Sequence, residues 1–482
     1  MNSKFRLSLL AVSAAAVLAG CATSSDKLGL AQNEQTLTYA KSYEPAREML
    51  LNNKFDELRT ALLANQKDAD GKELTNDENA EKLLESASEI SLLERGLLSL
   101  NTGDFKRALY YFDIAEQKLT NAEDNSSGLS QAGKFGKLGF SALTGSEEMA
   151  DYELRGYEKV MLLNYKALCY MLEGDRRAYN VTRRAIDRQQ EEWEKFKEEL
   201  AKVQSQTSMD PQTQALSGQV NIDDRPDDVK AKAGLVTSAY VNPFGDYVNG
   251  MLQEFDSFDD SSLRDNARIS YEKAYENNKE CTAAKVAAQQ VVKAPPAGKK
   301  LVQVILSDGF SPVRSEKHYE FMVDKYYVNL NLPVTVPVES DYASASVTVN
   351  GSTRKLSSLT KMESLILRDD QDRMPMKIFM LVTNTLRSAA ISKSLGAFGS
   401  RLAGNLQHPD TRSWLTLPSR IDVARVFVPN SAKEVKLNTY NAAGQVLGTT
   451  TVPIAAKGPT VVFASSYGKN LHAYGNSFSW VK

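Results

Sequence analysis

The chain has 482 residues, of which 42% are hydrophobic and 24% are charged, with 58 basic against 60 acidic side chains. This length is enough for two or three domains with apolar cores, and the proportions are those of an ordinary folded protein. The net charge of −2 excludes the strongly basic surface of nucleic-acid-binding proteins and a polybasic membrane patch.

The first residues carry the pattern of a secretory signal peptide. Lys4 and Arg6 precede a mostly apolar run at 7–18, and small residues follow this run. A charged start, a short apolar core and a small-residue cleavage site are the three parts of such a peptide. The run is shorter than the roughly 20 residues that a spanning helix needs. We therefore predict a signal peptide at residues 1–20.

The sequence LAGC at 18–21 matches a bacterial lipobox. We expect cleavage between Gly20 and Cys21, a lipid on Cys21 and a lipidated linker at 21–39; an ordinary signal peptide with a chance cysteine is the alternative. Two or three acyl chains, at roughly 0.8 kcal/mol per buried CH₂, make a stable anchor. Ala22 stands where an aspartate retains lipoproteins in the inner membrane of enteric bacteria. We therefore predict attachment to the periplasmic face of the outer membrane.

The stretch GLLSLNTGDFKRALYYFDIAEQ, residues 96–117, predicts two short helices joined at a Gly-Asp turn. Small and aromatic residues recur in it at the offsets of a tetratricopeptide (TPR) repeat. These residues are Gly96, Gly103, Phe105, Ala108, Phe112 and Ala115. In such a hairpin the small residues let two helices touch, and the aromatic rings fill the spaces opposite them.

Other segments repeat parts of this pattern. Residues 52–65 place Asn53 and Phe55 at matching offsets. Segments further along contribute Ala167 and Gly174, and then Ala267, Tyr271 and Ala274. We predict a TPR-like helical solenoid over residues 40–292, with an ordinary helical bundle as the alternative.

Two stretches between these segments are strongly polar. Residues 176–202 form a highly charged helical pattern, and we expect this helix to be a solvated arm. Residues 203–218 have the composition of a polar linker.

With Cys21 lipidated, Cys169 and Cys281 remain in a compartment that permits disulfides. Both lie in or beside predicted helices of the same half of the chain. A disulfide between them and two buried free thiols are the alternatives.

Residues 293–482 change to a β pattern. Pro295-Pro296 marks a break, and segments with alternating apolar residues follow, separated by Asn-Gly or Gly turns. Arg425 falls on an otherwise apolar strand face, so it is either paired or at a sheet edge. A helix at 377–395 interrupts the strands, and we expect it to pack on the sheet. The predicted fold class is α+β, an all-α TPR-like solenoid followed by a β-rich domain with one long helix.

Several segments resemble a poorly characterised family of bacterial outer-membrane lipoproteins that contain tetratricopeptide repeats. Asn242, Pro243 and Phe244, followed by YEKAYE at 271–276, are similar to the NPF-x-x-Y-x-x-G and YKKAYE segments of that family. DTRSWLTLPSRIDVARVFVP at 410–429 is similar to its DTRSW-x-x-LP-x-x-I-x-x-AR block, with Asp410, Arg412 and Trp414 at matching positions.

The resemblance covers roughly residues 40 to 440, with a departure at Val181-Thr182, where the family has Glu-Ala. It implies an outer-membrane lipoprotein often encoded beside a lipoprotein activator of penicillin-binding proteins. A role around peptidoglycan assembly follows as an expectation. The resemblance implies no enzymatic activity.

The chain has three histidines, His318, His408 and His472, and no HExxH, GxSxG, Walker A or paired-cysteine metal motif. The sequence HPDTR at 408–412 could bind an anion or carry out acid–base chemistry. We favour the interpretation that Asp410 caps this loop, Arg412 pairs and Trp414 packs beneath. We therefore predict no catalytic residue, no metal and no cofactor.

Two functions from different classes remain. The first is a lipid-anchored periplasmic scaffold that binds protein partners through a TPR-like groove, with a peptidoglycan-synthesis activator or another envelope lipoprotein as the candidate partner and no nucleic acid. The second is a glycan-binding module or glycan-active enzyme that uses the β domain. For Trp414 we predict burial between the sheet and the 377–395 helix, against an exposed stacking platform as the alternative.

Overall fold

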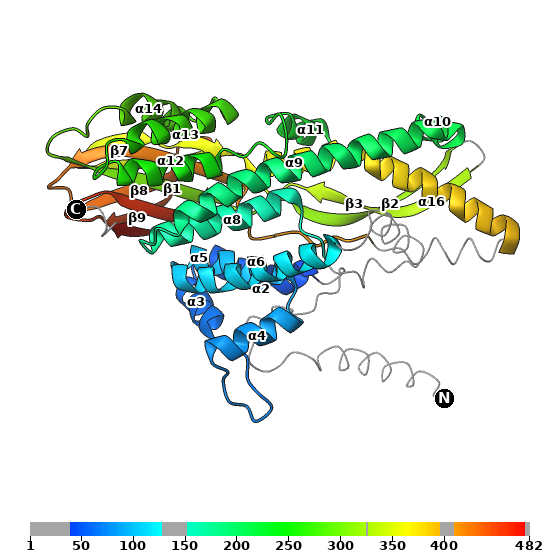
Figure 1. Cartoon of the computed structure of the whole chain (residues 1–482), viewed down its shortest axis with the longest axis horizontal. Helices are drawn as coiled ribbons and strands as arrows, with labels where there is room; N and C mark the ends of the chain where they lie inside the picture. The colour runs from blue at the N-terminus through cyan, green and yellow to red at the C-terminus, as the bar shows by residue number, and fades with distance from the viewer. Residues whose placement is uncertain (1–38, 128–151, 324–325, 396–408, 478–482) are drawn as a thin grey trace, which may run out of the picture.

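A computed structural model describes residues 39–127, 152–323, 326–395 and 409–477. The expected signal peptide 1–20, the expected lipidation site at Gly20 and Cys21, and His408 lie outside these ranges. Within them the chain is a mixed α+β protein, in which helices come first and the named strands begin at Lys299 (Figure 1).

The N-terminal half folds into helical hairpins that pack one after another along the chain. Its helices are α2 (Tyr39–Leu51), α3 (Phe55–Leu63), α4 (Asn76–Ser86), α5 (Glu89–Asn101), α6 (Phe105–Ser127), α8 (Gly156–Leu172), α9 (Ala178–Met209), α10 (Pro211–Ser217), α11 (Asp227–Ala233), α12 (Phe244–Asp256), α13 (Leu263–Asn277) and α14 (Thr282–Val291). α3 contacts α5, α6 contacts α8, and α9 contacts α12.

The turns inside hairpins α2–α3, α5–α6 and α8–α9 use left-handed backbone. Asn53, Gly103 and Gly174 have φ values of 61°, 77° and 70°. Glycine and asparagine adopt this conformation more easily than other residues. The predicted turns at these positions are therefore confirmed.

Small and aromatic residues fill the contact between α5 and α6, as the spacing predicts. A Cβ atom on Gly96 would lie only 2.4 Å from the Phe112 ring, so this close approach depends on glycine. Phe112 is buried, and Phe105 is half-buried. The predicted alanines and the tyrosine of this and later hairpins are also buried: Ala108, Ala115, Ala167, Ala267, Tyr271 and Ala274.

The strands form a central sheet, an outer sheet and a separate hairpin. The central sheet has the order β11 (Asn470–Ser477), β10 (Thr460–Tyr467), β1 (Lys299–Asp308), β7 (Arg420–Pro429) and β6 (Ser357–Thr360). The outer sheet has the order β5 (Ser352–Lys355), β4 (Ser344–Val349), β8 (Glu434–Tyr440) and β9 (Val446–Pro453). β2 (Val313–Val323) pairs with β3 (Tyr326–Val336). β1 and β10 are parallel, and the other paired strands are antiparallel.

The central sheet lies between the helices and the outer sheet. Along β1, Leu301 and Ile305 belong to the large apolar cluster that includes the helices. Val302 and Val304, on the opposite face, pack in a second cluster with residues of β4 and β8. The expected break between helices and strands falls between α14 and β1. The helices and the central sheet nevertheless share one continuous core.

An elongated extension projects from this layered body (Figure 1). We call it the arm: the β2–β3 hairpin, α10, α16 (Met374–Leu395) and residues 194–209 of α9. α16 follows α15 (Met362–Asp372) and contacts β3, α9 and α10. The helix expected at 377–395 therefore packs on the β2–β3 hairpin.

The expectation of a solvated helix at 176–202 is wrong. α9 buries one face that includes Val181, Phe196 and Val203, and it contacts α8, α12 and α16. The expected polar linker at 203–218 is helical, because it contains the end of α9 and α10. Among the described helices, none is both long enough and apolar enough to span a membrane.

Candidate functional site

The segment around Trp414 lies deep in the shared core. Trp414 is 1% exposed, which confirms the predicted burial. Its ring makes edge contacts with Phe112 of α6 and Tyr165 of α8, with centroid distances of 6.3 Å and 6.0 Å. The ring contacts thus come from the helical hairpins and not from the 377–395 helix named in the prediction.

Two buried glutamates hold the main chain of this segment. Glu158 of α8 accepts the Trp414 N–H at 3.0 Å. Glu94 of α5 accepts the N–H groups of Leu415 and Thr416 at 2.5 Å and 3.0 Å, and also the Thr416 hydroxyl. We call Glu94 and Glu158 the glutamate pair. It bonds three consecutive residues, at a turn of the chain before β7, to two different hairpins.

Further donors surround each member of the glutamate pair. The Tyr39 hydroxyl donates to Glu94 at 2.9 Å. The Tyr152 hydroxyl donates to Glu158 at 2.8 Å, and the Arg155 N–H does so at the same distance. Burial raises the pKa of Glu94 to about 7 although these hydrogen bonds oppose the shift, and burial also raises the pKa of Glu158.

Asp410 and Arg412 pin the start of the same segment. The Arg412 guanidinium binds both carboxylate oxygens of Asp410, at 2.9 Å and 2.8 Å, and the Arg412 N–H donates to the same carboxylate. Arg314 of β2 donates to the Arg412 carbonyl at 3.1 Å. These contacts agree with the interpretation of Asp410 and Arg412 as loop-holding residues.

The Asn242-Pro243-Phe244 block lies in the same interface. The Asn242 side chain accepts the Phe244 N–H and the hydroxyl of Thr360 in β6, both at 3.0 Å. The Phe244 ring contacts Tyr165 with centroids 5.7 Å apart. Tyr165 therefore touches both Phe244 and Trp414. Two of the segments on which the family resemblance rests therefore meet on this one tyrosine.

A second polar network joins α12 to the central sheet. Arg425 of β7 forms an ion pair with Glu254 at 2.5 Å, and both side chains are almost fully buried. The hydroxyl of Tyr271 donates to Glu254 at 2.8 Å, and Gln303 of β1 donates to it at 3.1 Å. Of the two alternatives for Arg425, the paired one is therefore found. β7 lies between β1 and β6, although β6 pairs only with Ile421 to Val423.

Sequence reasoning missed Glu94, Glu158, Tyr165 and Glu254. The signal available for Glu94 was a charged residue inside the apolar run EISLLERGLLSLN of α5. Such a buried charge is rare unless it is paired or hydrogen-bonded. The sequence alone could flag the position, but it could not name its partners.

The cysteines and the described histidines are not brought together. Cys169 and Cys281 are both buried free thiols, so the disulfide alternative is not the one found. Burial raises the pKa of Cys281 to about 12. His318 shares a hydrogen bond with Asn331 at 2.8 Å, and His472 stacks on Phe55.

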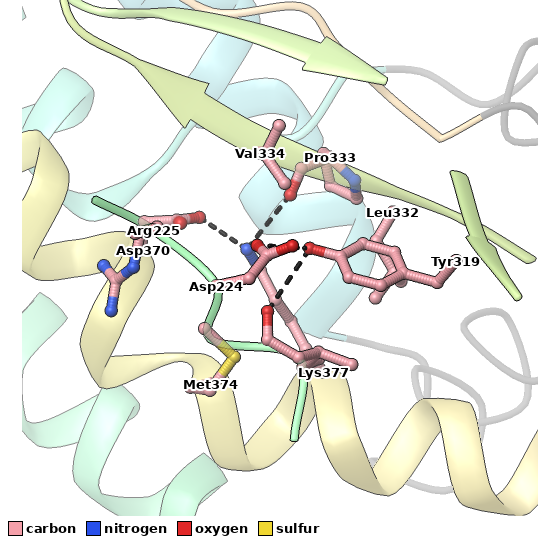
Figure 2. Close-up of a pocket in the computed structure, with 10 residues that line it drawn as sticks. Asp224, Arg225, Tyr319, Leu332, Pro333, Val334, Asp370, Met374 and Lys377 are labelled. Atoms are coloured by element: carbon pink, nitrogen blue, oxygen red, sulfur yellow. Dashed lines mark hydrogen bonds and ion pairs between the residues drawn. The ribbon is translucent and has the colours of Figure 1, made fainter. Parts of the chain in front are cut away.

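A small cavity lies at the base of the arm, where residues before α11, the β2–β3 hairpin and the junction of α15 and α16 meet (Figure 2). Lys377 donates to the Pro333 carbonyl at 3.1 Å and to Asp370 at 2.6 Å. The Tyr319 hydroxyl donates to Asp224 at 3.2 Å. Burial lowers the pKa of Lys377.

The cavity offers about 20 Å³ to water molecules, which is room for about one water. Pockets for small organic ligands enclose roughly 300–1,000 Å³. The polar side chains in this cavity mainly bond one another across the elements that meet there. The cavity is therefore a polar joint of the arm.

Within the described ranges, no group of three or more His, Cys, Asp or Glu residues could hold a metal ion. The described polar networks join strands and connecting segments to helices. Their hydrogen bonds and ion pairs hold parts of the fold together. Comparison of the chain with protein-family models, curated proteins and solved structures gives no match.

Proposed function

We propose that this protein is a lipid-anchored scaffold on the periplasmic face of the outer membrane, which presents the arm to protein partners. The observation that carries the proposal is the arm itself, which projects from the layered body (Figure 1). Its exposed apolar side chains include Met209, Met322 and Val336, with exposed fractions of 79%, 59% and 43%. Exposed apolar groups are favourable contacts for a protein partner.

Apolar packing and an ion pair hold the elements of the arm together. Tyr319 of β2, Leu381 and Val382 of α16 and Leu216 of α10 pack in one buried apolar cluster. Lys377 and Asp370 add an ion pair at the base of the arm. A preorganised projection loses less conformational entropy when it binds than a loose one does.

The proposal also includes TPR-like hairpins. Their inner surface holds the chain's own segment 414–416 and does not bind a partner. The order of packing, α3 on α5, α6 on α8 and α9 on α12, supports a repeat-like arrangement. Segment 414–416 docks on α5 and α8, and the helices share their core with the central sheet, so this face of the hairpins is covered by the chain itself. This arrangement favours the arm over the hairpins as the docking surface.

Photo-crosslinking in cells tests the proposal. A photoreactive residue is placed at Met322 or Val336 in the arm, with matched controls at Val446 and Val286 in the body, which are 57% and 40% exposed. We expect protein adducts from the arm positions and few from the controls, with the partners identified by mass spectrometry. A partner in peptidoglycan assembly is the expectation that the family resemblance adds.

Equal adducts from body and arm would contradict the proposal. Retention of the protein on purified peptidoglycan, without protein adducts from the arm, would instead support the glycan-binding alternative.

A further inference from the structure

Each member of the glutamate pair faces at least one hydroxyl group that can reverse its hydrogen bond. Glu94 meets the hydroxyls of Thr416 and Tyr39, and Glu158 meets the hydroxyl of Tyr152. A hydroxyl donates to a carboxylate and accepts from a protonated carboxyl group after a simple rotation. The hydrogen bonds of each glutamate can therefore be formed in both the charged and the protonated state. A site with only N–H donors would leave the proton of the carboxyl group without an acceptor.

The main-chain groups respond differently. The N–H groups of Leu415 and Thr416 can only donate, and they reach Glu94 only while segment 414–416 is docked. When this segment is docked, Glu94 is completely buried. When it is released, Glu94 meets water. Docking thus transfers the carboxyl group from water into the protein interior. The neutral, protonated form loses less solvation free energy in this transfer than the charged form does.

We propose that the glutamate pair is a proton-dependent latch, which holds segment 414–416 against hairpins α5–α6 and α8–α9 more tightly at acidic than at alkaline pH. The direction agrees with burial of Glu94, which raises its pKa from 4.5 to about 7. Between pH 4.5 and about pH 7, Glu94 is protonated while the segment is docked and charged once it is released. Release of the segment therefore releases a proton, and a higher pH favours it.

Other charged and titratable groups face the latch from the elements around it. Arg47 of α2 and Tyr467 of β10 lie on the Glu94 side, and burial lowers the pKa of Arg47. Arg314 of β2 faces Glu158 and favours its charged form. Tyr157, next to Glu158 in α8, is buried and neutral, since burial raises its pKa far above neutrality. The hydrogen bonds to Glu94 and the charge of Arg314 near Glu158 oppose protonation, and burial of each glutamate outweighs them.

The test is hydrogen exchange of the full-length protein between pH 5.5 and pH 8, corrected for the intrinsic exchange rate. One carboxyl group with a pKa of about 7 when docked and 4.5 when released changes the opening constant roughly 30-fold over this range. We expect this loss of protection at the N–H groups of Leu415 and Thr416. The N–H groups of β8 in the same sample report unfolding of the whole chain, which Asp308 also makes dependent on pH. Protection at Leu415 and Thr416 should therefore be lower than that of β8, as expected if their exchange reports local release of segment 414–416.

Variants locate the effect. Glu94→Gln should remove the roughly 30-fold part of the change that one carboxyl group supplies, since an amide has no proton to release, and leave only what Glu158 contributes. Glu85→Gln is the matched control, because Glu85 lies exposed on α4, and it should keep the full change. The latch is refuted if protection at Leu415 and Thr416 does not depend on pH, or if it equals that of β8, because these groups would then exchange only when the whole chain unfolds. An unchanged pH dependence in folded Glu94→Gln refutes it as well. The comparison with β8 uses only the natural chain, so it decides the matter even if Glu94→Gln does not fold.

Discussion

Arg425 and Glu254 form a buried ion pair that connects strand β7 of the central sheet to helix α12, and the two residues are 171 positions apart in the sequence. Their side chains are only 2% and 3% exposed. Gln290 of α14 accepts a further hydrogen bond from Arg425 at 2.8 Å. The pair therefore attaches the last described helices before β1 to the face of the sheet.

Removal of one partner of this pair should be costly. We expect Arg425→Met to lower the free energy of unfolding by about 3–5 kcal/mol, because it leaves the Glu254 charge buried without its partner. Glu254→Gln should also destabilise the protein, since it leaves Arg425 charged. The double variant should lose clearly less than the sum of the two single losses. Chemical denaturation of the four proteins measures this coupling, and additive losses would show that the pair does not act as a unit.

Gly96→Ala should destabilise the α5–α6 hairpin. The added methyl group would lie 2.4 Å from the Phe112 ring, and overpacking of this kind costs about 1–3 kcal/mol. Gly218→Ala is the matched control, because the nearest atom to its new methyl group is 3.7 Å away and its φ of −69° suits alanine. Thermal unfolding should separate the two variants. Equal midpoints would mean that Phe112 moves aside without cost.

Trp414→Ala should destabilise the whole chain by about 3–5 kcal/mol, the usual range for loss of a buried tryptophan. Because Trp414 contacts α6 and α8, the full-length protein is the correct sample. Trp193→Ala on α9 should have a smaller effect, since Trp193 is only partly buried. A Trp414→Ala protein with an unchanged midpoint and lost partner binding would instead favour a stacking role.

Asp308 predicts how stability changes with pH. Burial raises the pKa of Asp308 from 3.8 to about 7. The folded state thus keeps a proton that the unfolded state releases, so this contribution is full below pH 3.8 and is lost as the pH rises through 7. We expect stability to fall between pH 5 and pH 8. Glu94 and Asp246 add to the fall, because burial raises their pKa values to about 7 and about 6.

Asp308→Asn should remove up to about 2–3 kcal/mol of this pH dependence. Asp228→Asn, at an exposed position of α11, is the control and should leave the dependence intact. Denaturation midpoints at pH 5 and pH 8 provide the measurement. A dependence of the same size in Asp308→Asn and the natural chain would assign the titration to other groups.

Cys21→Ala tests the predicted anchor. The variant should lose incorporation of labelled fatty acid and leave the membrane fraction, because a lipid on Cys21 is the only attachment that the sequence predicts. Cys281→Ala should keep both properties. Labelling of Cys21→Ala at the natural level would refute the lipobox interpretation.

Local patterns in the sequence predicted local structure well. The spacing of Gly96, Ala108 and Phe112 predicted a helical hairpin, because it reports contacts between helices that are neighbours along the chain. The turns at Gly103 and Gly174 were predictable because few residues adopt positive φ. Alternating apolar residues predicted the strands for the same local reason.

Contacts between distant segments were not predictable from these patterns. Trp414 was expected to be buried, but its hydrogen bond to Glu158 spans 256 positions, and no local spacing reports such a distance. The same limit explains the wrong expectation for α9. The many charges of residues 176–202 indicated a solvated helix, and only the neighbouring α16 and Tyr240 complete the buried face that includes Phe196.

The parallel pairing of β1 with β10 has a consequence for the order in which the molecule folds. Val302 pairs with Thr460, so the middle of the central sheet waits for a strand near the end of the chain. Contacts between such distant segments form slowly, because the chain loses conformational entropy before the contacts that offset this loss are made. Until β10 arrives, β1 presents an unpaired edge next to apolar helices, which invites aggregation. A newly made chain therefore needs either a chaperone or rapid completion of its last strands, and truncation before Thr460 should yield an insoluble product.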